Sequence, residues 1–178
     1  MLHSLQSGFR KSHSCCTALI NLIDNWLKDV DDGKYVGAVF IDLRKAFDLV
    51  DHTMLIEKLK CYNFSALTVD LMKSYLTNRC QLVKYNDCPS NMLQVKAGVP
   101  QGSIIGPLLF LIYINDLSLH ISPNCDIDLY ADDSTIHNSS HDINEINMYL
   151  QESVDKVSQW CKNNNMCINP EKSKCMTV

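Results

Sequence analysis

Apolar residues recur at helical spacing along several stretches of the chain. Between Thr17 and Val30 they fall on one face, which predicts an amphipathic helix that ends in a turn at Asp31-Asp32-Gly33. The side chains that this pattern places toward a core are Leu19, Leu22, Ile23, Trp26, Leu27 and Val30. Another helix follows Ser65, a suitable N-cap, and is expected to bury Leu67, Leu71, Met72 and Tyr75. Further helices are predicted at 53–60, 103–117 and 143–160.

Short β-rich segments alternate irregularly with these helices. The run Tyr35–Ile41 (YVGAVFI) predicts a buried strand. Two antiparallel hairpins are predicted, one from 79–85 and 92–97, and one from 127–130 and 135–138 with Ala131-Asp132-Asp133-Ser134 at its tip. Two more short strands are predicted at 166–168 and 175–178. This order indicates an α+β fold, in which helices cover one face of an antiparallel sheet of three to four strands.

Composition narrows the class of protein. The 178 residues are 46% hydrophobic and 20% charged, which fits one globular domain or the core of a larger one and excludes a disordered or collagen-like chain. The nine cysteines include no C-x-x-C pair, so we expect free thiols in a reducing intracellular compartment, nucleus or cytoplasm. The apolar run Ile104–Ile114 is too short to cross a bilayer, so no membrane partner is expected. The net charge of −4 gives no indication of nucleic-acid binding.

Three aspartates stand where predicted strands end. Asp42 follows the run that ends at Ile41, and Asp132 and Asp133 lie at the tip of the second hairpin. Taken singly, Asp42 fits a helix cap and the pair fits a turn. Brought together, two carboxylates about 4 Å apart repel by roughly 4 kcal/mol at an effective dielectric of about 20, so protons or cations must neutralise them. Oxygen ligands without clustered His or Cys favour Mg²⁺ or Mn²⁺, which predicts metal-dependent phosphoryl or nucleotidyl transfer.

Three motifs in order resemble the palm motifs of reverse transcriptases. They are FIDLRKAFDLVDH (Phe40–His52), AGVPQGSIIGPLLFLIYINDL (Ala97–Leu117) and YADDS (Tyr130–Ser134), and they are flanked by QSGFRKSHSC and WCKNNNMCINPEKSKCM. The nearest resemblance, from about Gln6 to Met176, is to non-LTR retrotransposons, the jockey-like long interspersed elements. It implies an RNA-directed DNA polymerase palm with partial fingers and no thumb. The implied division is partial fingers at 1–34, palm at 35–60 and 97–178, and an insertion with a helix and a hairpin at 61–96.

The resemblance also implies the metal site. Asp42 and Asp132 match the ligands of two Mg²⁺ ions, Asp133 is the adjacent acid, and the carbonyl of Ile41 is expected to face a metal. Lys172 matches a lysine that protonates the departing pyrophosphate or pairs with its charge. The alternative to this catalytic role is that Lys172 is an ordinary solvent-exposed lysine in a loop.

Further residues match the family's substrate contacts. The backbone amides of Leu43, Arg44, Lys45 and Ala46 resemble a turn that holds the incoming triphosphate. Phe47 matches the steric gate that excludes a ribose 2′-hydroxyl, although core packing is the simpler interpretation without the family. Gln101 and Gly102 match the loop that lines the nascent base pair, and a glycine turn before a helix is compatible with that role. Arg10 and Lys11 are expected near nucleic acid, with plain surface exposure as the alternative.

The implied partners are an RNA template, a DNA primer and a deoxynucleoside triphosphate, while the oligomeric state stays open. The resemblance places the earliest finger motifs before this chain and the thumb after it, which accounts for the acidic net charge. Two rival functions are an RNA-templated RNA polymerase, against which Phe47 argues, and a catalytically inactive palm remnant that acts as an RNA-binding or interaction module. RNA-recognition modules stack bases on exposed sheet aromatics, and no K/R-G-F-x-F strand occurs here.

Overall fold

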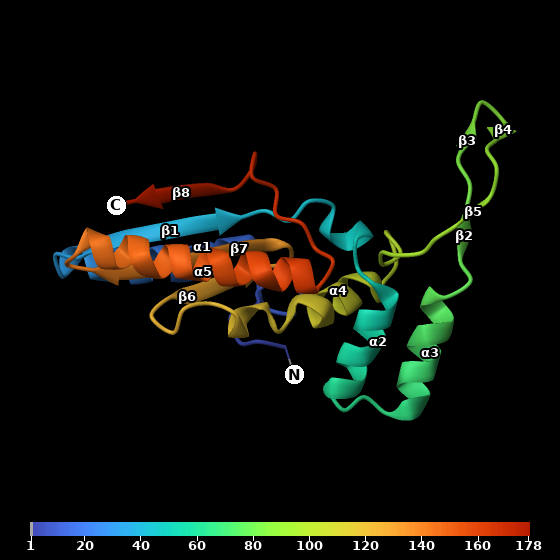
Figure 1. Cartoon of the computed structure of the whole chain (residues 1–178), viewed down its shortest axis with the longest axis horizontal. Helices are drawn as coiled ribbons and strands as arrows, with labels where there is room; N and C mark the ends of the chain where they lie inside the picture. The colour runs from blue at the N-terminus through green and yellow to red at the C-terminus, as the bar shows by residue number, and fades with distance from the viewer. Residues whose placement is uncertain (1) are drawn as a thin grey trace. The chain divides into compact units, whose positions relative to one another are not determined.

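The computed structural model describes residues 2–178, which form two compact units (Figure 1). The first unit combines the segment up to Ala46 with Ile114–Val178, and the second unit is Phe47–Tyr113. The mixed helices and antiparallel strands confirm the predicted α+β class.

A four-stranded antiparallel sheet organises the first unit. Its strand order is β6-β7-β1-β8, and the strands span Tyr35–Ile41 (β1), Asp126–Tyr130 (β6), Asp133–Ser140 (β7) and Lys174–Thr177 (β8). Strand β1 has the predicted bounds and lies between β7 and β8, with which it pairs antiparallel. The predicted strand at 166–168 is reduced to an isolated bridge between Leu43 and Ile168.

One helix packs on each face of this sheet. Helix α5 (Ile143–Asn163) covers the face to which Gly37 points, because a Cβ built on Gly37 would lie 2.3 Å from Ile146 Cγ2. Helix α1 (Cys15–Asp31) lies against the other face, where Trp26 meets Phe40 with ring centroids 6.4 Å apart. Positions 37 and 40 point to opposite faces because side chains alternate along a strand. The sequence predicted helices on one face only, so the presence of α5 on one face and α1 on the other corrects that part of the prediction.

The prediction of a broad buried face on α1 was wrong. Only Leu22 is buried, Trp26 is half-buried, and Leu19 and Leu27 are 55% and 56% exposed. The helix packs on the sheet through about one residue per turn, Leu22 and then Trp26. Within the described residues, its other apolar side chains have no neighbours that bury them.

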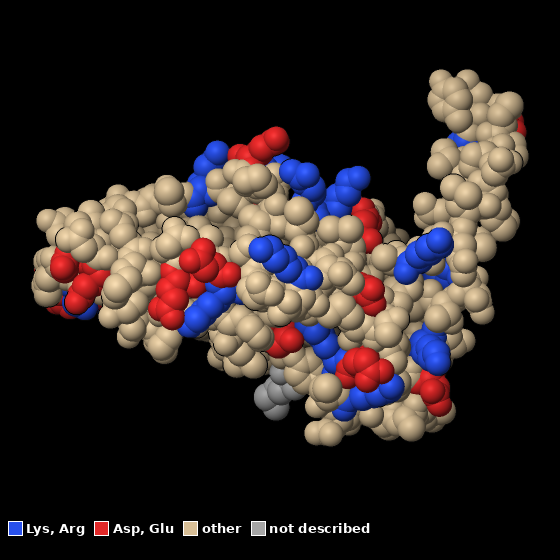
Figure 2. Space-filling model, viewed as in Figure 1, with Lys and Arg blue, Asp and Glu red and all other residues tan. Residues whose placement is uncertain are grey.

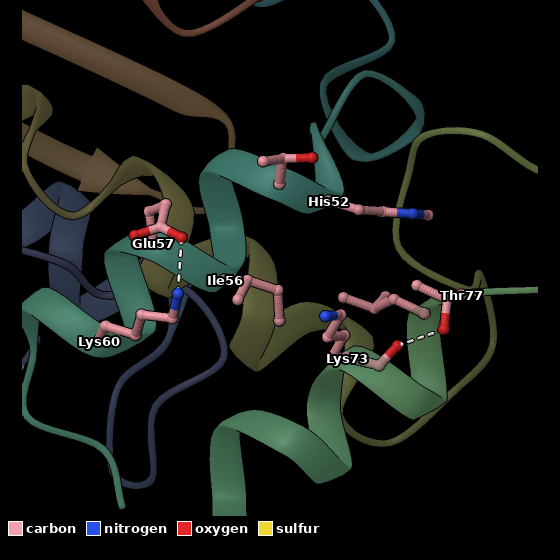
Figure 3. Close-up of a pocket in the computed structure, with 8 residues that line it drawn as sticks. His52, Ile56, Glu57, Lys60, Lys73 and Thr77 are labelled. Carbon is pink, nitrogen blue, oxygen red and sulfur yellow. Dashed lines mark hydrogen bonds and ion pairs between the residues drawn. The ribbon is translucent and has the colours of Figure 1, made fainter. Parts of the chain in front are cut away.

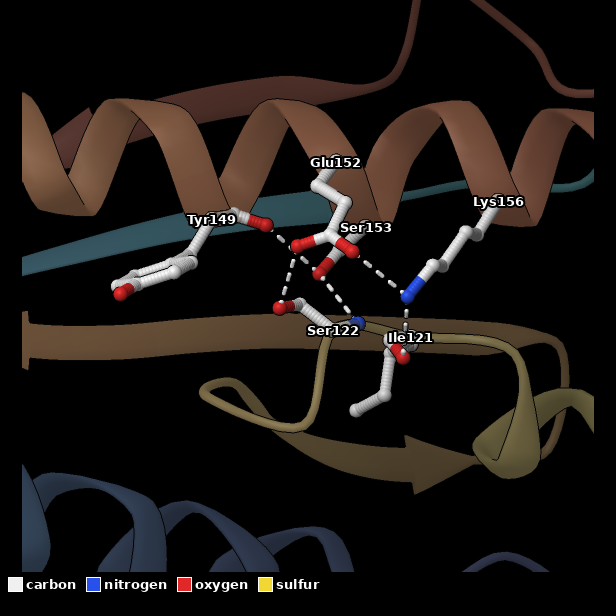
Figure 4. Close-up of polar contacts among 6 residues, drawn as sticks. All are labelled: Ile121, Ser122, Tyr149, Glu152, Ser153 and Lys156. Atoms are coloured by element: carbon white, nitrogen blue, oxygen red, sulfur yellow. Dashed lines mark hydrogen bonds and ion pairs between the residues drawn. The ribbon is translucent and has the colours of Figure 1, made fainter.

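Polar contacts attach α5 to the loop that leads into β6 (Figure 4). The buried Ser122 N–H donates to Ser153 Oγ at 3.0 Å, and the Ser122 hydroxyl donates to Glu152 at 2.7 Å. Lys156 pairs with Glu152 at 2.8 Å, and the Lys156 contact, followed by the Ser122 hydroxyl, lowers the pKa of Glu152. These bonds fix the start of the β6–β7 hairpin relative to α5.

Helices α2 and α3 begin the second unit. Asp51 and Ser65 are the N-caps of α2 (His52–Cys61) and α3 (Ala66–Leu76), the latter as predicted. On α3 the buried residues are Val69 and Leu76, whereas the expected core residue Leu67 is 81% exposed and Leu71 is 60% exposed, so the predicted buried face of this helix was wrong. Among the described helices and strands, α3 packs mainly on α2, which needs a narrower apolar face.

The predicted hairpin of the second unit is present but interrupted. Four two-residue strands replace two continuous ones, with Cys80–Gln81 (β2) paired to Leu93–Gln94 (β5) and Lys84–Tyr85 (β3) to Cys88–Pro89 (β4). Helix α4 (Gly106–Ile114) follows, with Pro107 in its first turn as expected. Short 3₁₀ turns lie at Ala46–Asp48 and Leu117–Leu119. No helix within residues 2–178 is long and apolar enough to cross a membrane.

A pocket of about 250 Å³ lies between α2 and α3 (Figure 3). Its polar groups largely bond to one another: Lys60 pairs with Glu57 at 2.7 Å, and the Thr77 hydroxyl donates to the Lys73 carbonyl at 2.8 Å. His52 Nε2 lies 2.8 Å from the carbonyl oxygen of Gly98. That bond attaches the 97–101 segment to α2.

Charged side chains of both signs are interspersed on the face that Figure 2 shows. Several cations are paired with acids, including Lys34 with Asp29 at 2.7 Å and Lys84 with Asp87 at 2.7 Å.

Candidate active site

Asp42 is the first residue after β1. The antiparallel register pairs Ile41 with Ser134 on β7, and continuing it by one residue puts Asp42 opposite Asp133. The apolar run of β1 thus ends where the acidic hairpin tip begins. The convergence of these strand ends, which the sequence predicted, is a consequence of this pairing.

Asp132 and Asp133 lie at the tip of the β6–β7 hairpin. Tyr130 pairs with Asp133, which leaves Ala131 and Asp132 as the two loop residues. Ala131 has a φ of +55°, a backbone angle that residues other than glycine rarely adopt. A positive φ at the first loop position is typical of the type II′ turns that join twisted strands.

The charges of the other predicted catalytic side chains act on Asp133. Loss of hydration raises the pKa of the Asp133 carboxyl above its ordinary value, and the negative charges of Asp132 and Asp42 raise it further. The ammonium of Lys172 acts in the opposite direction and lowers this pKa. Like charges therefore gather at the end of β1, with one cation near them.

Two residues that sequence reasoning missed hold Asp42 in place. The Asn169 side-chain amide donates to Asp42 Oδ2 at 2.9 Å, and the Asn169 main-chain N–H donates to the Asp42 carbonyl at 2.8 Å. The Asp42 N–H lies 3.2 Å from Ser173 Oγ, which can accept from it. The only sequence signal was the turn Asn169–Ser173 before β8, and its contact with Asp42 spans 127 residues.

The carboxylates fit a divalent cation by their chemistry, although they do not form a closed cage. Within residues 2–178, no group of three or more His, Cys, Asp or Glu side chains is arranged to hold a metal ion. Mg²⁺ commonly takes only one or two protein carboxylates and completes its shell with water and substrate phosphates. The raised pKa of Asp133 means that its charged form is disfavoured, which a cation between the acids relieves.

The turn after β1 is tightly held. The Arg44 N–H donates to the Cys167 carbonyl at 2.7 Å, so this amide of the predicted triphosphate turn is already bonded. Lys45 has a left-handed φ of +48°, and Arg44 and Lys45 are exposed, while Leu43 and Ala46 are buried.

The remaining nucleotide-site candidates belong to the second unit. Phe47 stacks on Phe110 with ring centroids 4.2 Å apart. The Gln101 side-chain amide donates to Asp48 at 2.8 Å. Gly102 has a φ of +76°, and a Cβ there would meet open space, so backbone conformation rather than crowding requires glycine.

Arg10 and Lys11 differ in their surroundings. Arg10 Nη1 donates hydrogen bonds of 2.8–3.1 Å to the carbonyl oxygens of His3, Ser4 and Gln6. The guanidinium therefore stabilises the backbone conformation of the N-terminal segment. Lys11 is exposed. Contact of either residue with nucleic acid stays a prediction.

The sequence pattern of the reverse transcriptase (RNA-dependent DNA polymerase) family matches residues 1–178. The chain belongs to the reverse transcriptase family. The probable RNA-directed DNA polymerase from transposon BS of Drosophila melanogaster is 37% identical over 181 residues, covering 97% of this chain and 20% of the relative. The RNA-directed DNA polymerase from mobile element jockey of the same species is 32% identical over 179 residues, covering 97% of this chain and 19% of the relative.

A solved structure supports the fold of this reverse transcriptase domain. Telomerase from Candida tropicalis, in complex with the TWJ fragment of telomeric RNA, matches it with a TM-score of 0.70 at 14% identity. The match covers 96% of this chain and 30% of the telomerase chain. The reverse transcriptase domain spans about a fifth of the length of the transposon relatives. The expected resemblance to non-LTR retrotransposon reverse transcriptases is confirmed.

Proposed function

We propose that this domain is the catalytic palm of an RNA-directed DNA polymerase that adds deoxynucleotides to a primer 3′-hydroxyl on an RNA template and releases pyrophosphate. The observation that carries the proposal is the strand register that brings Asp42 to the Asp132-Asp133 hairpin. The pKa of Asp133, raised by burial and then by the charges of Asp132 and Asp42, supports it. Under this proposal 35–60 and 97–178 are palm, 1–34 belong to the fingers, and 61–96 are an insertion. The nine free cysteines favour a reducing compartment, the nucleus or cytoplasm.

Asp42 and Asp132 are the residues that we expect to hold two Mg²⁺ ions, or Mn²⁺, with support from Asp133 and the carbonyl of Ile41. The chemistry supplied there by bound divalent ions is activation of the 3′-hydroxyl and stabilisation of the leaving pyrophosphate. Asn169 keeps the Asp42 carboxylate oriented through its hydrogen bond. Lys172, whose charge reaches this cluster, donates a proton to the departing pyrophosphate or pairs with it.

Selection of the nucleotide is proposed for a second set of residues. The amides of Leu43, Lys45 and Ala46 bind the triphosphate, while that of Arg44 stays bonded to the Cys167 carbonyl and holds the turn in shape. Phe47 excludes the 2′-hydroxyl with a ring that Phe110 keeps in place. Gln101 and Gly102 line the nascent base pair.

Template binding is proposed for a cavity of the second unit. This cavity, of about 780 Å³, has Gln101, Arg79 and Lys96 among its lining residues. The two cations provide charge for backbone phosphates, and the polar amide faces the same space. Arg10 and Lys11 are the proposed contacts of the first unit.

Primer extension on poly(rA) with an oligo(dT) primer tests the proposal, with this chain, wild type or variant, joined to the flanking finger and thumb segments of a transposon relative. We expect extension with Mg²⁺ or Mn²⁺ by the wild-type chain and none by Asp42→Asn or Asp132→Asn. Equal extension by wild type and both variants contradicts the assigned site. Normal template binding without any extension by the wild-type chain favours the alternative, a catalytically inactive palm remnant that binds RNA or another protein.

A further inference from the structure

The segment Leu5–Gly8, here called the strap, lies along the free edge of the sheet at β6. Gln6 forms a parallel bridge with Leu129, the Ser7 N–H donates to the Leu129 carbonyl at 2.8 Å, and the Leu129 N–H donates to the Leu5 carbonyl at 3.2 Å. Because β6 is the outer strand of the sheet, the strap supplies the backbone partners that this edge otherwise lacks.

The side chain of Gln6 reaches the acidic hairpin. Gln6 is 2% exposed, and its Oε1 accepts hydrogen bonds from the Ala131 N–H at 3.0 Å and from the Gly8 N–H at 2.7 Å. Ala131 is the residue with the left-handed φ of +55°, immediately before Asp132. An alanine in that conformation persists only where its surroundings hold it.

Two further features fix the strap. A Cβ on Gly8 would lie 2.3 Å from the Ala131 nitrogen, so only glycine allows this approach. Arg10 Nη1 bridges the carbonyls of His3, Ser4 and Gln6 and thereby closes the loop that carries Gln6. Both features belong to the QSGFR sequence, of which the proposed function uses only Arg10, as a contact for nucleic acid.

We infer that Gln6 is a positioning residue for the metal site: its buried amide oxygen holds the strained Ala131 peptide and thereby aims the carboxylate of Asp132. This inference rests on the proposed function. It goes beyond it by making the N-terminal segment, 125 residues away in sequence, a working part of the hairpin tip. Gln6 itself touches neither metal nor substrate and acts only through the backbone of Ala131.

The test compares variants that differ at the amide oxygen. Gln6→Met keeps the length of the side chain and removes the acceptor, whereas Gln6→Glu retains an acceptor at that position. Gln151→Met, on the exposed surface of α5, is the matched control. The readouts are hydrogen exchange of the Ala131 amide and Mn²⁺ binding by the metal-free full chain, followed by electron paramagnetic resonance.

In Gln6→Met we expect Ala131 exchange to accelerate about tenfold and Mn²⁺ affinity to fall about tenfold, as for other residues that orient metal ligands. Gln6→Glu and Gln151→Met should keep the slow exchange of the wild type. Slow Ala131 exchange in Gln6→Met, or faster exchange with unchanged Mn²⁺ affinity, overturns the positioning role while the proposed function stands. Absence of Mn²⁺ binding by the wild-type chain contradicts the proposed function itself, and the inference falls with it.

If Gln6→Met does not fold, as judged by circular dichroism, Gly8→Ala provides the second test. Its methyl group displaces the strap from Ala131 and leaves the Gln6 acceptor intact. We expect the same loss of Ala131 protection and of Mn²⁺ affinity. Wild-type values for both in Gly8→Ala overturn the inference.

Discussion

Asn169 holds Asp42 from two sides, since its side-chain amide donates to the Asp42 carboxylate at 2.9 Å and its main-chain N–H donates to the Asp42 carbonyl at 2.8 Å. The turn before β8 thus fixes both the backbone and the side chain of the proposed metal ligand. This relationship makes Asn169 a residue whose loss affects the site more than the fold.

Replacing Asn169 by alanine removes the side-chain bond and keeps the backbone bond. We expect Asn169→Ala to lower Mn²⁺ affinity about 10- to 100-fold, because residues that orient metal ligands have effects of that size. Mn²⁺ titration of the metal-free chain measures this. Asn163→Ala, at the exposed end of α5, is the control and should bind as wild type. Equal affinity in Asn169→Ala and Asn163→Ala refutes the orienting role.

Asp133 makes stability depend on pH. Because its folded-state pKa is raised above the ordinary 3.8, the folded chain holds this proton more tightly than the unfolded chain, and stability falls as pH rises from 3.8 through the raised value. Asp133→Asn should therefore raise the melting temperature of the metal-free chain at pH 7 and lose this advantage near pH 3. Thermal unfolding at both pH values decides the point, with Asp155→Asn on the surface of α5 as control. A lower melting temperature of Asp133→Asn at pH 7 contradicts the assigned repulsion.

Gly98 is required by both space and conformation. Its φ is +90°, and a Cβ would lie 2.9 Å from the Asp48 carbonyl oxygen and 3.0 Å from Asp48 Cα. Gly98→Ala should destabilise the chain by roughly 2–4 kcal/mol, from backbone strain and overpacking combined. Gly33→Ala is the matched control, because Gly33 has a φ of +75° but open space around it, and it should cost about 1 kcal/mol. Urea unfolding of the two variants gives the comparison, and equal losses contradict the steric argument.

Phe47 is the proposed gate against ribonucleotides. Phe47→Ala removes the ring that stacks on Phe110 and should raise the ratio of ribonucleotide to deoxynucleotide incorporation by about tenfold or more. Single-nucleotide primer extension measures the ratio, and Phe47→Tyr, which keeps the ring, should retain the wild-type preference. Unchanged sugar selectivity in Phe47→Ala removes the gate assignment.

Ser153 on α5 accepts a hydrogen bond from the loop that leads into the β6–β7 hairpin. Ser153→Ala leaves the buried Ser122 N–H without its acceptor and should cost about 1–3 kcal/mol. Ser158→Ala, on the same helix, should change the free energy of unfolding by less than about 0.5 kcal/mol. Chemical denaturation compares them, and equal stability of the two variants would show that the contact in Figure 4 adds nothing.

Residue patterns within a short segment predicted the bounds of a strand and the start of a helix. The apolar, β-branched run at Tyr35–Ile41 gave β1 its bounds, and Ser65 gave α3 its N-cap. Which helical face is buried depends on the width of the partner surface, which no periodicity contains. That is why Leu19 and Leu67, apolar and correctly placed on helices, are exposed.

The aspartates of the candidate site were found from motifs and strand ends, but their supports were not. Asn169 bonds to Asp42 across 127 residues, and Gln6 bonds to Ala131 across 125. Both residues lie in the sequence blocks that flank the three motifs, but their partners follow from sheet register and loop closure, which the sequence pattern does not contain.

Divalent-cation binding tests the central claim most directly. Mn²⁺ titration of the metal-free chain, read by electron paramagnetic resonance, should show binding by the wild type and at least about tenfold weaker binding by Asp42→Asn and by Asp132→Asn, with Asp155→Asn unaffected. Mn²⁺ binding of wild-type strength in both Asp42→Asn and Asp132→Asn would contradict the account.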